Sequence, residues 1–232
     1  LLGENGAGKS TLIKILSGYH QPDKGGEILI DGKPVIFKDP RDAIKASIVT
    51  IYQELTLCPD MSVAENIALF LNDLKPVIDI RQVDQHIQEL AVRYNLQVRS
   101  QAKVSELCIG EQQKVEILKL LLSGAKILIL DEPTRVLAPH EVTALYQVLK
   151  NLRADGFAII LITHKMKEVL DCSDRITILR GGHVVGSILR SQASEARLVD
   201  MMFGKMTPDL LKEKKDTTSE SLSPVLELRS AG

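Results

Sequence analysis

Nine residues near the start of the chain have the composition and spacing of a phosphate-binding loop. They match the pattern Gly-x-x-x-x-Gly-Lys-Ser/Thr, in which glycines permit a tight turn whose backbone N–H groups point at phosphate oxygens. Lys9 can reach the β- and γ-phosphates of a nucleotide, and the Ser10 hydroxyl can bind Mg²⁺. The predicted loop, and with it a site for a nucleoside triphosphate, consists of Gly3, Glu4, Asn5, Gly6, Ala7, Gly8, Lys9, Ser10 and Thr11.

Two acidic residues, Asp131 and Glu132, directly follow an apolar run of strand length. A carboxylate at such a strand end can hold Mg²⁺ through water, which is the role we expect for Asp131. Glu132 can act as a general base that polarises a water molecule for attack on the γ-phosphate. The alternative is a plain acidic turn, but the phosphate loop upstream favours the catalytic interpretation.

The hydrophobic pattern predicts the elements that must position these residues. Residues 126–130 and 157–162 are continuous apolar runs, typical of parallel strands buried on both faces. Helical spacing dominates between residues 57 and 123, where Asp79 and Gln82 resemble a capping pair and a further helix is expected to start near Gly110. We also expect helices at 9–16, 42–46 and 141–152, a strand at 48–51, and hairpins at 27–36 and 175–185.

The order of these segments resembles the nucleotide-binding domain of ABC transporters. In sequence order they are the phosphate loop, Gln53, a Leu-x-x-Gly segment, the Asp131–Glu132 pair and His164. The resemblance covers residues 1–204 and implies an α/β fold of the P-loop NTPase type. This fold has a mostly parallel sheet, a small antiparallel β subdomain and a helical subdomain inserted at about residues 57–123. The resemblance also implies ATP and Mg²⁺ as ligands.

The resemblance assigns further roles residue by residue. Gln53 matches the glutamine that senses Mg²⁺ and the γ-phosphate, and His164 matches the switch histidine that contacts the γ-phosphate. The alternatives are a surface glutamine and a structural histidine. The family's signature, which contacts the ATP held by a facing domain, is matched by Leu107, Cys108, Ile109, Gly110 and Glu111.

The signature departs from the family's usual Leu-Ser-Gly-Gly-Gln. Cys108 stands in place of serine, and a thiol is a much weaker hydrogen-bond donor than a hydroxyl. Ile109 replaces glycine and Glu111 replaces glutamine, while Ala138 stands where many members carry aspartate. These changes put the facing ATP site in question, whereas the site built on Lys9 keeps its chemical groups.

Three segments, residues 52–55, 62–67 and 110–117, are similar to the ATPases that power import of simple sugars or nucleosides. In that group two nucleotide-binding domains lie in one polypeptide. The resemblance therefore implies a second nucleotide-binding domain, transmembrane permease subunits and, indirectly, a substrate-binding protein as partners. It also implies a peripheral location on the cytoplasmic face of the cell membrane.

The two ends of the chain suggest how it is organised. Residues 205–223 are rich in Ser, Thr and Lys, which predicts a linker, and residues 224–232 resemble the first strand of a second domain. The alternative is a plain C-terminal tail. Only Leu1 and Leu2 precede the phosphate loop, where a whole strand is expected, so we expect the chain to be a fragment.

Composition limits the other functions. Among 232 residues the net charge is −1, aromatic residues make up 3% and tryptophan is absent, so neither a basic surface nor a stacking platform for nucleic acid is indicated. The three cysteines lack metal-site spacing and are expected to be reduced thiols. Two alternative functions remain open: an ABC ATPase that acts on ribosomes or nucleic acid, and a regulatory domain that binds ATP with little turnover.

Overall fold

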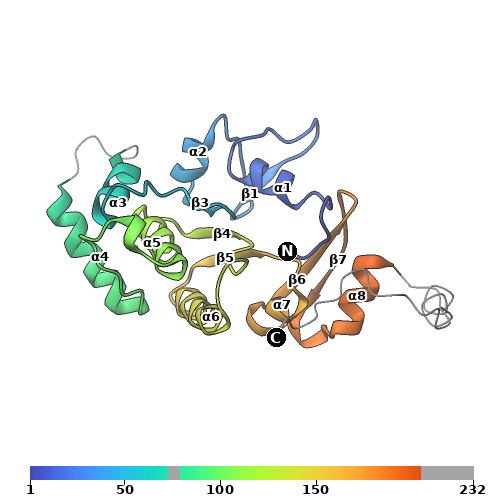
Figure 1. Ribbon diagram of the computed structural model, residues 1–232. Coiled ribbons are helices and arrows are strands. Elements are labelled where there is room, and N and C mark those ends of the chain that lie inside the picture. Colours follow the sequence, from blue (N-terminus) through green and yellow to red (C-terminus); the bar gives the residue numbers. More distant parts are fainter. Residues whose placement is uncertain (73–78, 205–232) are drawn as a thin grey trace, which may run out of the picture.

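The computed structural model describes residues 1–72 and 79–204, which form an α/β structure (Figure 1). The predicted linker at 205–223 and strand start at 224–232 lie outside the described residues. The strands are β1 Ile28–Ile30, β2 Lys33–Val35, β3 Ile48–Ile51, β4 Ile127–Asp131, β5 Ala158–Ile162, β6 Arg175–Arg180 and β7 His183–Leu189. The helices are α1 Lys9–Leu16, α2 Pro40–Lys45, α3 Val63–Asn72, α4 Ile80–Tyr94, α5 Ile109–Leu122, α6 Pro139–Ala154, α7 Met166–Cys172 and α8 Glu195–Phe203, with short 3₁₀ turns at Val104–Glu106 and Arg190–Gln192.

A parallel sheet of order β3-β4-β5 forms the centre of the molecule. Ile51 pairs with Leu130, and Asp131 pairs with Ile162, so all three strands end at the same edge. Leu2, just before the phosphate loop, makes parallel bridges to both Thr163 and Ile178 and so joins this sheet to β6. The residues that follow Leu2, β3, β4 and β5 therefore meet at one edge.

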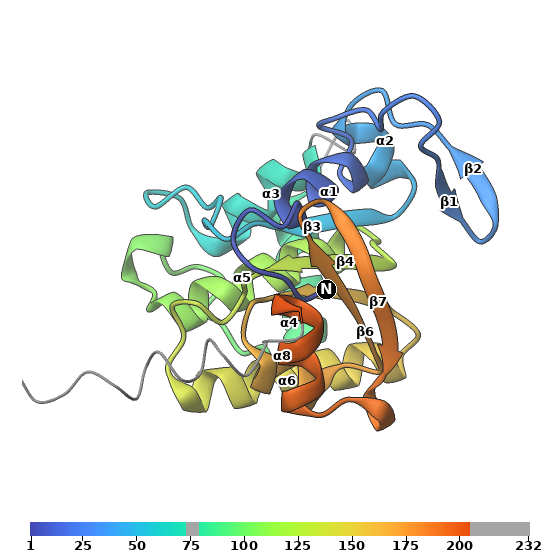
Figure 2. The same cartoon turned by 90° about the vertical axis from the view of Figure 1, so that its right-hand side faces the viewer.

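Two antiparallel hairpins and a group of helices surround this sheet. The β1–β2 hairpin projects from the body of the molecule, and the β6–β7 hairpin lies on the opposite side of β5 from β4 (Figures 1 and 2). The helices α3, α4 and α5 pack on one another beside β3. The predicted α/β class, with a mostly parallel sheet, an antiparallel β part and an inserted helical part, is confirmed.

The apolar core has three parts that follow these elements. The largest joins α3, α4, α5 and α6 to β3 and β4, and includes the fully buried Ile67, Ile87 and Leu118. A second, around Ile13 and Ile129, packs α1 and α2 on the sheet. A third packs α7 and α8 on β6. The sheet is thus covered on both faces near its carboxyl edge.

One prediction needs correction, and two helices lie outside the predicted elements. The strand at 157–162 is not buried on both faces: Ala158 is exposed, because the start of β5 is paired on one side only, with β4, and borders a cavity of about 880 Å³ on the other. The helix expected to start near Gly110 is confirmed and begins at Ile109. The helices α7 and α8 were not predicted, because their charged residues obscure any apolar face.

Within residues 1–72 and 79–204, no helix combines the length and the apolar character needed to cross a lipid bilayer.

Candidate active site

The phosphate loop has the backbone shape that its glycines predict. Gly6 and Gly8 have φ values of 80° and 98°, a left-handed conformation that residues with a side chain rarely adopt. A Cβ atom on Gly3 would lie 2.6 Å from the backbone oxygen of Leu179 in β6, so only glycine fits there. The helix α1 then begins at Lys9 without a side-chain cap, which leaves its first N–H groups free to bind an anion.

The side chain of Lys9 is bonded to the backbone at the start of this loop. This side chain is only 7% exposed, and its Nζ donates hydrogen bonds to the backbone oxygens of Gly3 at 2.8 Å and Glu4 at 2.9 Å. A buried ammonium requires such partners, because an unpaired charge is costly to desolvate. Ser10 and Thr11, at the start of α1, are exposed. The loop therefore offers a preplaced positive charge beside accessible hydroxyls and N–H groups.

The predicted base and the predicted switch residue contact each other. Nδ1 of His164 lies 2.7 Å from Oε1 of Glu132, and the imidazole is 48% exposed whereas the carboxylate is 14% exposed. Glu132 has a left-handed backbone with φ of 46°, and its N–H donates to the oxygen of Ile162 at the end of β5. The strand ends of β4 and β5 thus bring together two residues that are far apart in the sequence.

Asp131 ends β4, directly before Glu132, and is close enough to Lys9 of the phosphate loop for their charges to interact. Burial and the neighbouring charge of Glu132 raise the pKa of Asp131, and the ammonium of Lys9 opposes that rise. Two adjacent carboxylates in a half-buried place repel each other, and a divalent cation would relieve this repulsion. The carboxylate of Asp131 and the hydroxyl of Ser10 are hard oxygen donors of the kind that Mg²⁺ prefers. The residues present therefore fit a Mg²⁺ ion.

Gln53 is exposed and follows the end of β3, at the same edge of the sheet. Just after it, Thr56 is tied to α5: its N–H and its hydroxyl donate to Oε1 of Glu116 at 2.8 and 3.0 Å. Lys119 pairs with the other oxygen of Glu116 and donates to the Thr56 hydroxyl at 2.9 Å. We call Thr56, Glu116 and Lys119 the Glu116 cluster.

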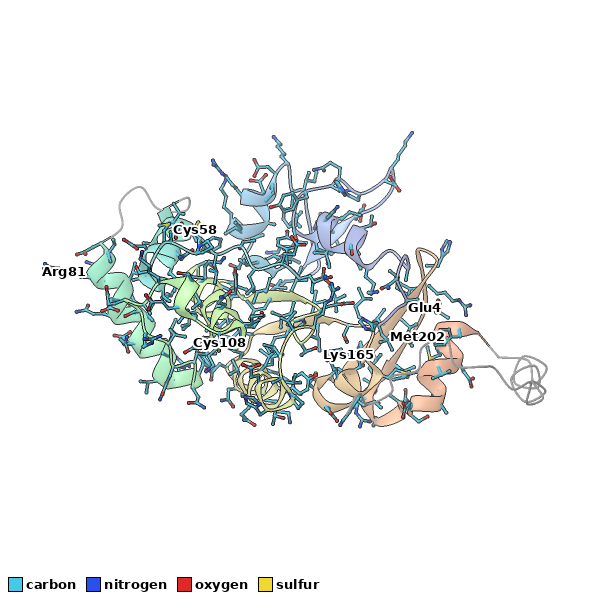
Figure 3. All side chains as sticks on the ribbon, viewed as in Figure 1. Glu4, Cys58, Arg81, Cys108, Lys165 and Met202 are labelled. Atoms are coloured by element: carbon cyan, nitrogen blue, oxygen red, sulfur yellow. The ribbon has the colours of Figure 1, made fainter. Side chains whose placement is uncertain are left out.

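The signature residues lie at the start of α5, away from the phosphate loop, as Cys108 and Glu4 show in Figure 3. Cys108 and Ile109 are exposed, while Leu107 is buried. Glu111 accepts a hydrogen bond from the backbone N–H of Cys108 at 2.9 Å, and this bond lowers the pKa of Glu111. Within the described chain the signature is therefore not part of the site around Lys9.

Gly110 lies against the side chain of Glu141, so any larger residue at position 110 would force that carboxylate to move. A Cβ atom there would lie 2.0 Å from Oε1 of Glu141, which caps the start of α6 by accepting from the N–H of Ala138 at 2.8 Å. The four histidines other than His164 are all exposed.

Sequence reasoning missed a buried group beneath the catalytic pair. Glu168 of α7 is 6% exposed and accepts hydrogen bonds from the hydroxyls of Thr134 and Thr163, while Lys165 lies 3.1 Å from its Oε1. We call Thr134, Thr163, Lys165 and Glu168 the Glu168 cluster. The only signal in the sequence is the closeness of each threonine to Glu132 or His164.

Comparisons with known proteins agree with this geometry. A family model described as ABC transporter matches residues 1–135. The chain is 43% identical over 218 residues to the ribose import ATP-binding protein RbsA 2 of Escherichia coli O157:H7, covering 93% of this chain and 43% of that protein. It is 41% identical to the ribose import ATP-binding protein RbsA 1 of Rubrobacter xylanophilus, covering 100% of this chain and 46% of that protein. The chain thus spans less than half the length of these curated relatives.

Solved structures show the same fold. The protein cbiO1 from Clostridium perfringens, part of the ABC transporter complex cbiONQ, aligns with a TM-score of 0.72 and 25% identity, covering 91% of this chain and 85% of that one. MJ1267, an ATP-binding cassette of an ABC transporter, aligns with a TM-score of 0.74 and 24% identity over 86% of this chain and 85% of that one. The second likeness concerns the fold alone.

Proposed function

The chain belongs to the ABC transporter family, and from this premise we propose that it binds and hydrolyses ATP to power the import of a sugar or nucleoside. The proposal rests on one observation: the phosphate-loop lysine, the acidic end of β4 and the Glu132–His164 pair all lie at the same edge of the sheet. The names of the curated relatives favour ribose or a similar simple sugar as the cargo.

Each residue has a role in the proposed hydrolysis. Backbone N–H groups of residues 3–11 and the ammonium of Lys9 hold the phosphates and stabilise the negative charge that develops on them. Glu132 accepts a proton from the attacking water, and His164 orients Glu132 and contacts the γ-phosphate. Ser10, Asp131 and Gln53 are the proposed Mg²⁺ ligands, Asp131 through water. When bound, Mg²⁺ supplies charge neutralisation between the β- and γ-phosphates.

We also propose how the unit is completed. Residues 1–204 are one nucleotide-binding domain, residues 205–223 are a linker and residues 224–232 begin a second such domain of the same polypeptide. Leu107, Cys108, Ile109, Gly110 and Glu111 serve the ATP site of the facing domain. Support comes from the exposed position of Cys108 and Ile109 at a helix start, where N–H groups can meet a phosphate.

The proposed partners are permease subunits, which the domain contacts at the cytoplasmic face of the membrane, and a substrate-binding protein that acts through them. Two alternatives belong to other classes: an ATPase acting on ribosomes or nucleic acid, and a regulatory ATP-binding domain with little turnover. The net charge of −1 speaks against action on ribosomes or nucleic acid. The presence of a base–histidine pair speaks against a domain with little turnover.

The substitution Glu132→Gln tests the catalytic assignment in the full-length protein. Loss of the base is expected to lower steady-state ATP hydrolysis by about 10²–10⁴-fold while ATP binding is kept. Glu89, which is exposed on α4, provides the control with the same chemical change. The variant Glu89→Gln should hydrolyse ATP at the wild-type rate. Unchanged turnover in Glu132→Gln would refute the assignment and favour the regulatory alternative.

Reconstitution tests the transport role. The full-length protein should co-purify with permease subunits in mild detergent, and vesicles that contain the complex should accumulate labelled ribose only when ATP is present. Co-sedimentation of the protein with ribosomes, without ATP-dependent sugar uptake, would favour the first alternative instead.

A further inference from the structure

The carboxylate of Glu168 binds the two loops that carry the catalytic pair. We propose that Glu168 is a positioning residue that sets the contact between Glu132 and His164, an inference that rests on the proposed ATPase function. Glu168 itself lies beneath the pair, on α7, and touches neither residue through the hydrogen bonds of its side chain.

Each oxygen of this carboxylate holds a different loop. Oε1 accepts a hydrogen bond from the hydroxyl of Thr134, in the loop that follows Glu132. Oε2 accepts from the hydroxyl of Thr163 at 2.9 Å, and Thr163 immediately precedes His164. Both threonines are almost completely buried, at 2% and 1% exposure. Bonds of this kind, made to an ionised acceptor away from water, are short and directional.

Lys165 closes the same network from the other side. Its Nζ lies 3.1 Å from Oε1 of Glu168 and donates to the backbone oxygen of Thr134 at 3.3 Å. Its backbone N–H donates to the hydroxyl of Thr163 at 3.0 Å. His164 is therefore held on both sides, since its two sequence neighbours belong to the Glu168 cluster.

The backbone of Glu132 shows why such support is needed. A left-handed conformation costs a residue with a side chain roughly 1–2 kcal/mol and persists only where the surroundings enforce it. At Glu132, φ is 46°; its N–H donates to the oxygen of Ile162 and its carbonyl accepts from the N–H of Arg135 at 3.1 Å. Two residues further on, the side chain of Thr134 fixes the loop to Glu168. Without the bond from Thr134 to Glu168, the loop can relax and turn the catalytic carboxylate away from His164.

The arrangement has a specific kinetic consequence. A misplacement of about 1 Å in a catalytic group can reduce turnover by about 10²-fold. The phosphate loop is held through Lys9 and by Gly3 against β6, and Leu2 before it bridges Thr163 through the backbone, which Glu168→Gln leaves in place. Nucleotide binding is therefore expected to depend little on the carboxylate of Glu168. Loss of the carboxylate should therefore lower kcat and leave KM for ATP nearly unchanged.

The test compares Glu168→Gln with Glu116→Gln in the full-length protein. Glu116 is the matched control because it is buried to a similar degree and also pairs with a threonine and a lysine, but lies in α5. We expect Glu168→Gln to lower kcat by about 10–100-fold with KM for ATP changed by less than about 3-fold. We expect Glu116→Gln to lower stability to a similar degree and to leave the contact between Glu132 and His164 intact. Because Thr56 follows the proposed Mg²⁺ ligand Gln53, the control for kcat is the exposed residue Glu89, changed to Gln.

A spectroscopic measurement reports the contact itself. In the nucleotide-free protein with labelled histidine, the ring signal of His164, assigned with His164→Asn, should shift in Glu168→Gln in the same direction as in Glu132→Gln. It should stay in place in Glu116→Gln. Because this readout needs no turnover, it tests the positioning role even if the wild-type protein proves not to hydrolyse ATP, which would instead refute the proposed function.

A second pair of variants covers the case in which Glu168→Gln does not fold. Thr134→Val removes one of the two hydrogen bonds, and Thr134→Ser keeps the hydroxyl. The valine variant should reproduce the loss of kcat and the shifted His164 signal, and the serine variant should restore both. An unmoved His164 signal in Glu168→Gln or Thr134→Val, or an equal shift of that signal in Glu116→Gln, would overturn the proposal.

Discussion

The Glu116 cluster and the Glu168 cluster use the same chemistry in two different places. In each, a buried glutamate accepts hydrogen bonds from threonine and pairs with a lysine three positions away on the helix. They differ in how the two carboxylate oxygens are used. Glu116 takes both bonds of Thr56 on one oxygen and Lys119 on the other, whereas Glu168 takes a threonine from a different loop on each oxygen.

This difference separates stability from positioning. Lys119 is only 7% exposed, so the Glu116 cluster is a dry ion pair that fastens one loop to one helix. Lys165 is 41% exposed, and the Glu168 cluster instead joins two strand ends at the active site. The burial of a carboxylate alone does not distinguish a stabilising role from a positioning role. The number of separate segments that the carboxylate joins does distinguish them.

Removing the lysine of each cluster should give the largest difference between them. Lys119→Met leaves the buried carboxylate of Glu116 without its counterion, which typically costs about 3–5 kcal/mol of unfolding free energy. Lys165→Met also leaves a buried carboxylate, but Glu168 keeps its two threonine bonds and the lost ammonium is half-exposed, so the cost should be smaller, about 1–3 kcal/mol. Urea denaturation of both variants measures these values.

A double variant distinguishes the ion pair from simple packing. Glu116→Gln combined with Lys119→Met removes the unpaired charge and keeps an acceptor for Thr56, so part of the lost stability should return. Equal losses in the two lysine variants would contradict the distinction between a dry and a half-exposed pair.

The threonines should separate stability from positioning. Thr56→Val and Thr163→Val each remove a hydroxyl that donates to a glutamate and accepts from a lysine N–H group. Each should lower the unfolding free energy by about 1–3 kcal/mol, because buried partners lose their bonds. Only Thr163→Val should also shift the ring signal of His164. If Thr56→Val shifts that signal equally, the two clusters do not differ in function.

Asp131 is a half-buried acid that belongs to neither glutamate cluster. Its effect on protein stability should change with pH in the opposite direction to that of a well-paired carboxylate. Its pKa is raised by burial and by Glu132, so the folded protein binds the proton of Asp131 more tightly than the unfolded chain does. Ionisation of Asp131 therefore reduces stability above the raised pKa, and this penalty is absent below 3.8, the usual pKa of an aspartate.

Asp131→Asn should consequently be more stable than the wild type at pH 7 in Mg²⁺-free buffer, and the gain should shrink as the pH falls toward 4. Thermal unfolding of both proteins across this range measures the effect. A gain that does not vary with pH would show that ionisation of Asp131 is not its cause.

The smallest effect concerns reactivity and involves no loss of stability. Burial, with the charge of Glu168 as a further cause, raises the pKa of Cys172 to about 11 from the usual 9.0, and its thiol bonds to the backbone oxygen of Glu168. At pH 8 its thiolate should be about 100-fold scarcer than that of an ordinary cysteine. Iodoacetamide should therefore modify the exposed Cys58 and Cys108 well before Cys172, as mass spectrometry would detect.

Labelling of Cys172 also reports on the Glu168 cluster. Glu168→Gln should speed the modification of Cys172 and leave that of Cys58 unchanged. Modification of all three cysteines at one rate in the wild type would mean that α7 opens freely.

The chemical groups of the site were readable from the sequence, because a phosphate loop and an acidic strand end have fixed spacing. The loop from Gly3 to Thr11, the strand that ends at Asp131 and the strand before His164 all appear where the pattern predicts them. Apolar periodicity placed α5 as well, through Val115 and Leu118. The roles of Glu132, His164 and Gln53 in turnover stay predictions.

The residues that support the site could not be predicted from the sequence. Glu168 lies in a short helix among Lys165, Lys167 and Asp171, so it looks like part of a solvated surface. Its partner Thr134 is distant in sequence, and only the folding of β4 beside β5 brings them together. The same holds for Glu116, which looks exposed in a helix pattern built on apolar residues but is buried because α5 is covered on all sides.

The left-handed backbone at Glu132 has a consequence for how this position can vary over evolutionary time. Glycine adopts such a conformation at little cost, so selection for stability alone would favour glycine there by about 1 kcal/mol. Selection for turnover requires a carboxylate instead. In a gene copy released from the demand for hydrolysis, residue 132 is therefore free to drift toward glycine, and a glycine at this position in a duplicate would mark a site that has given up catalysis.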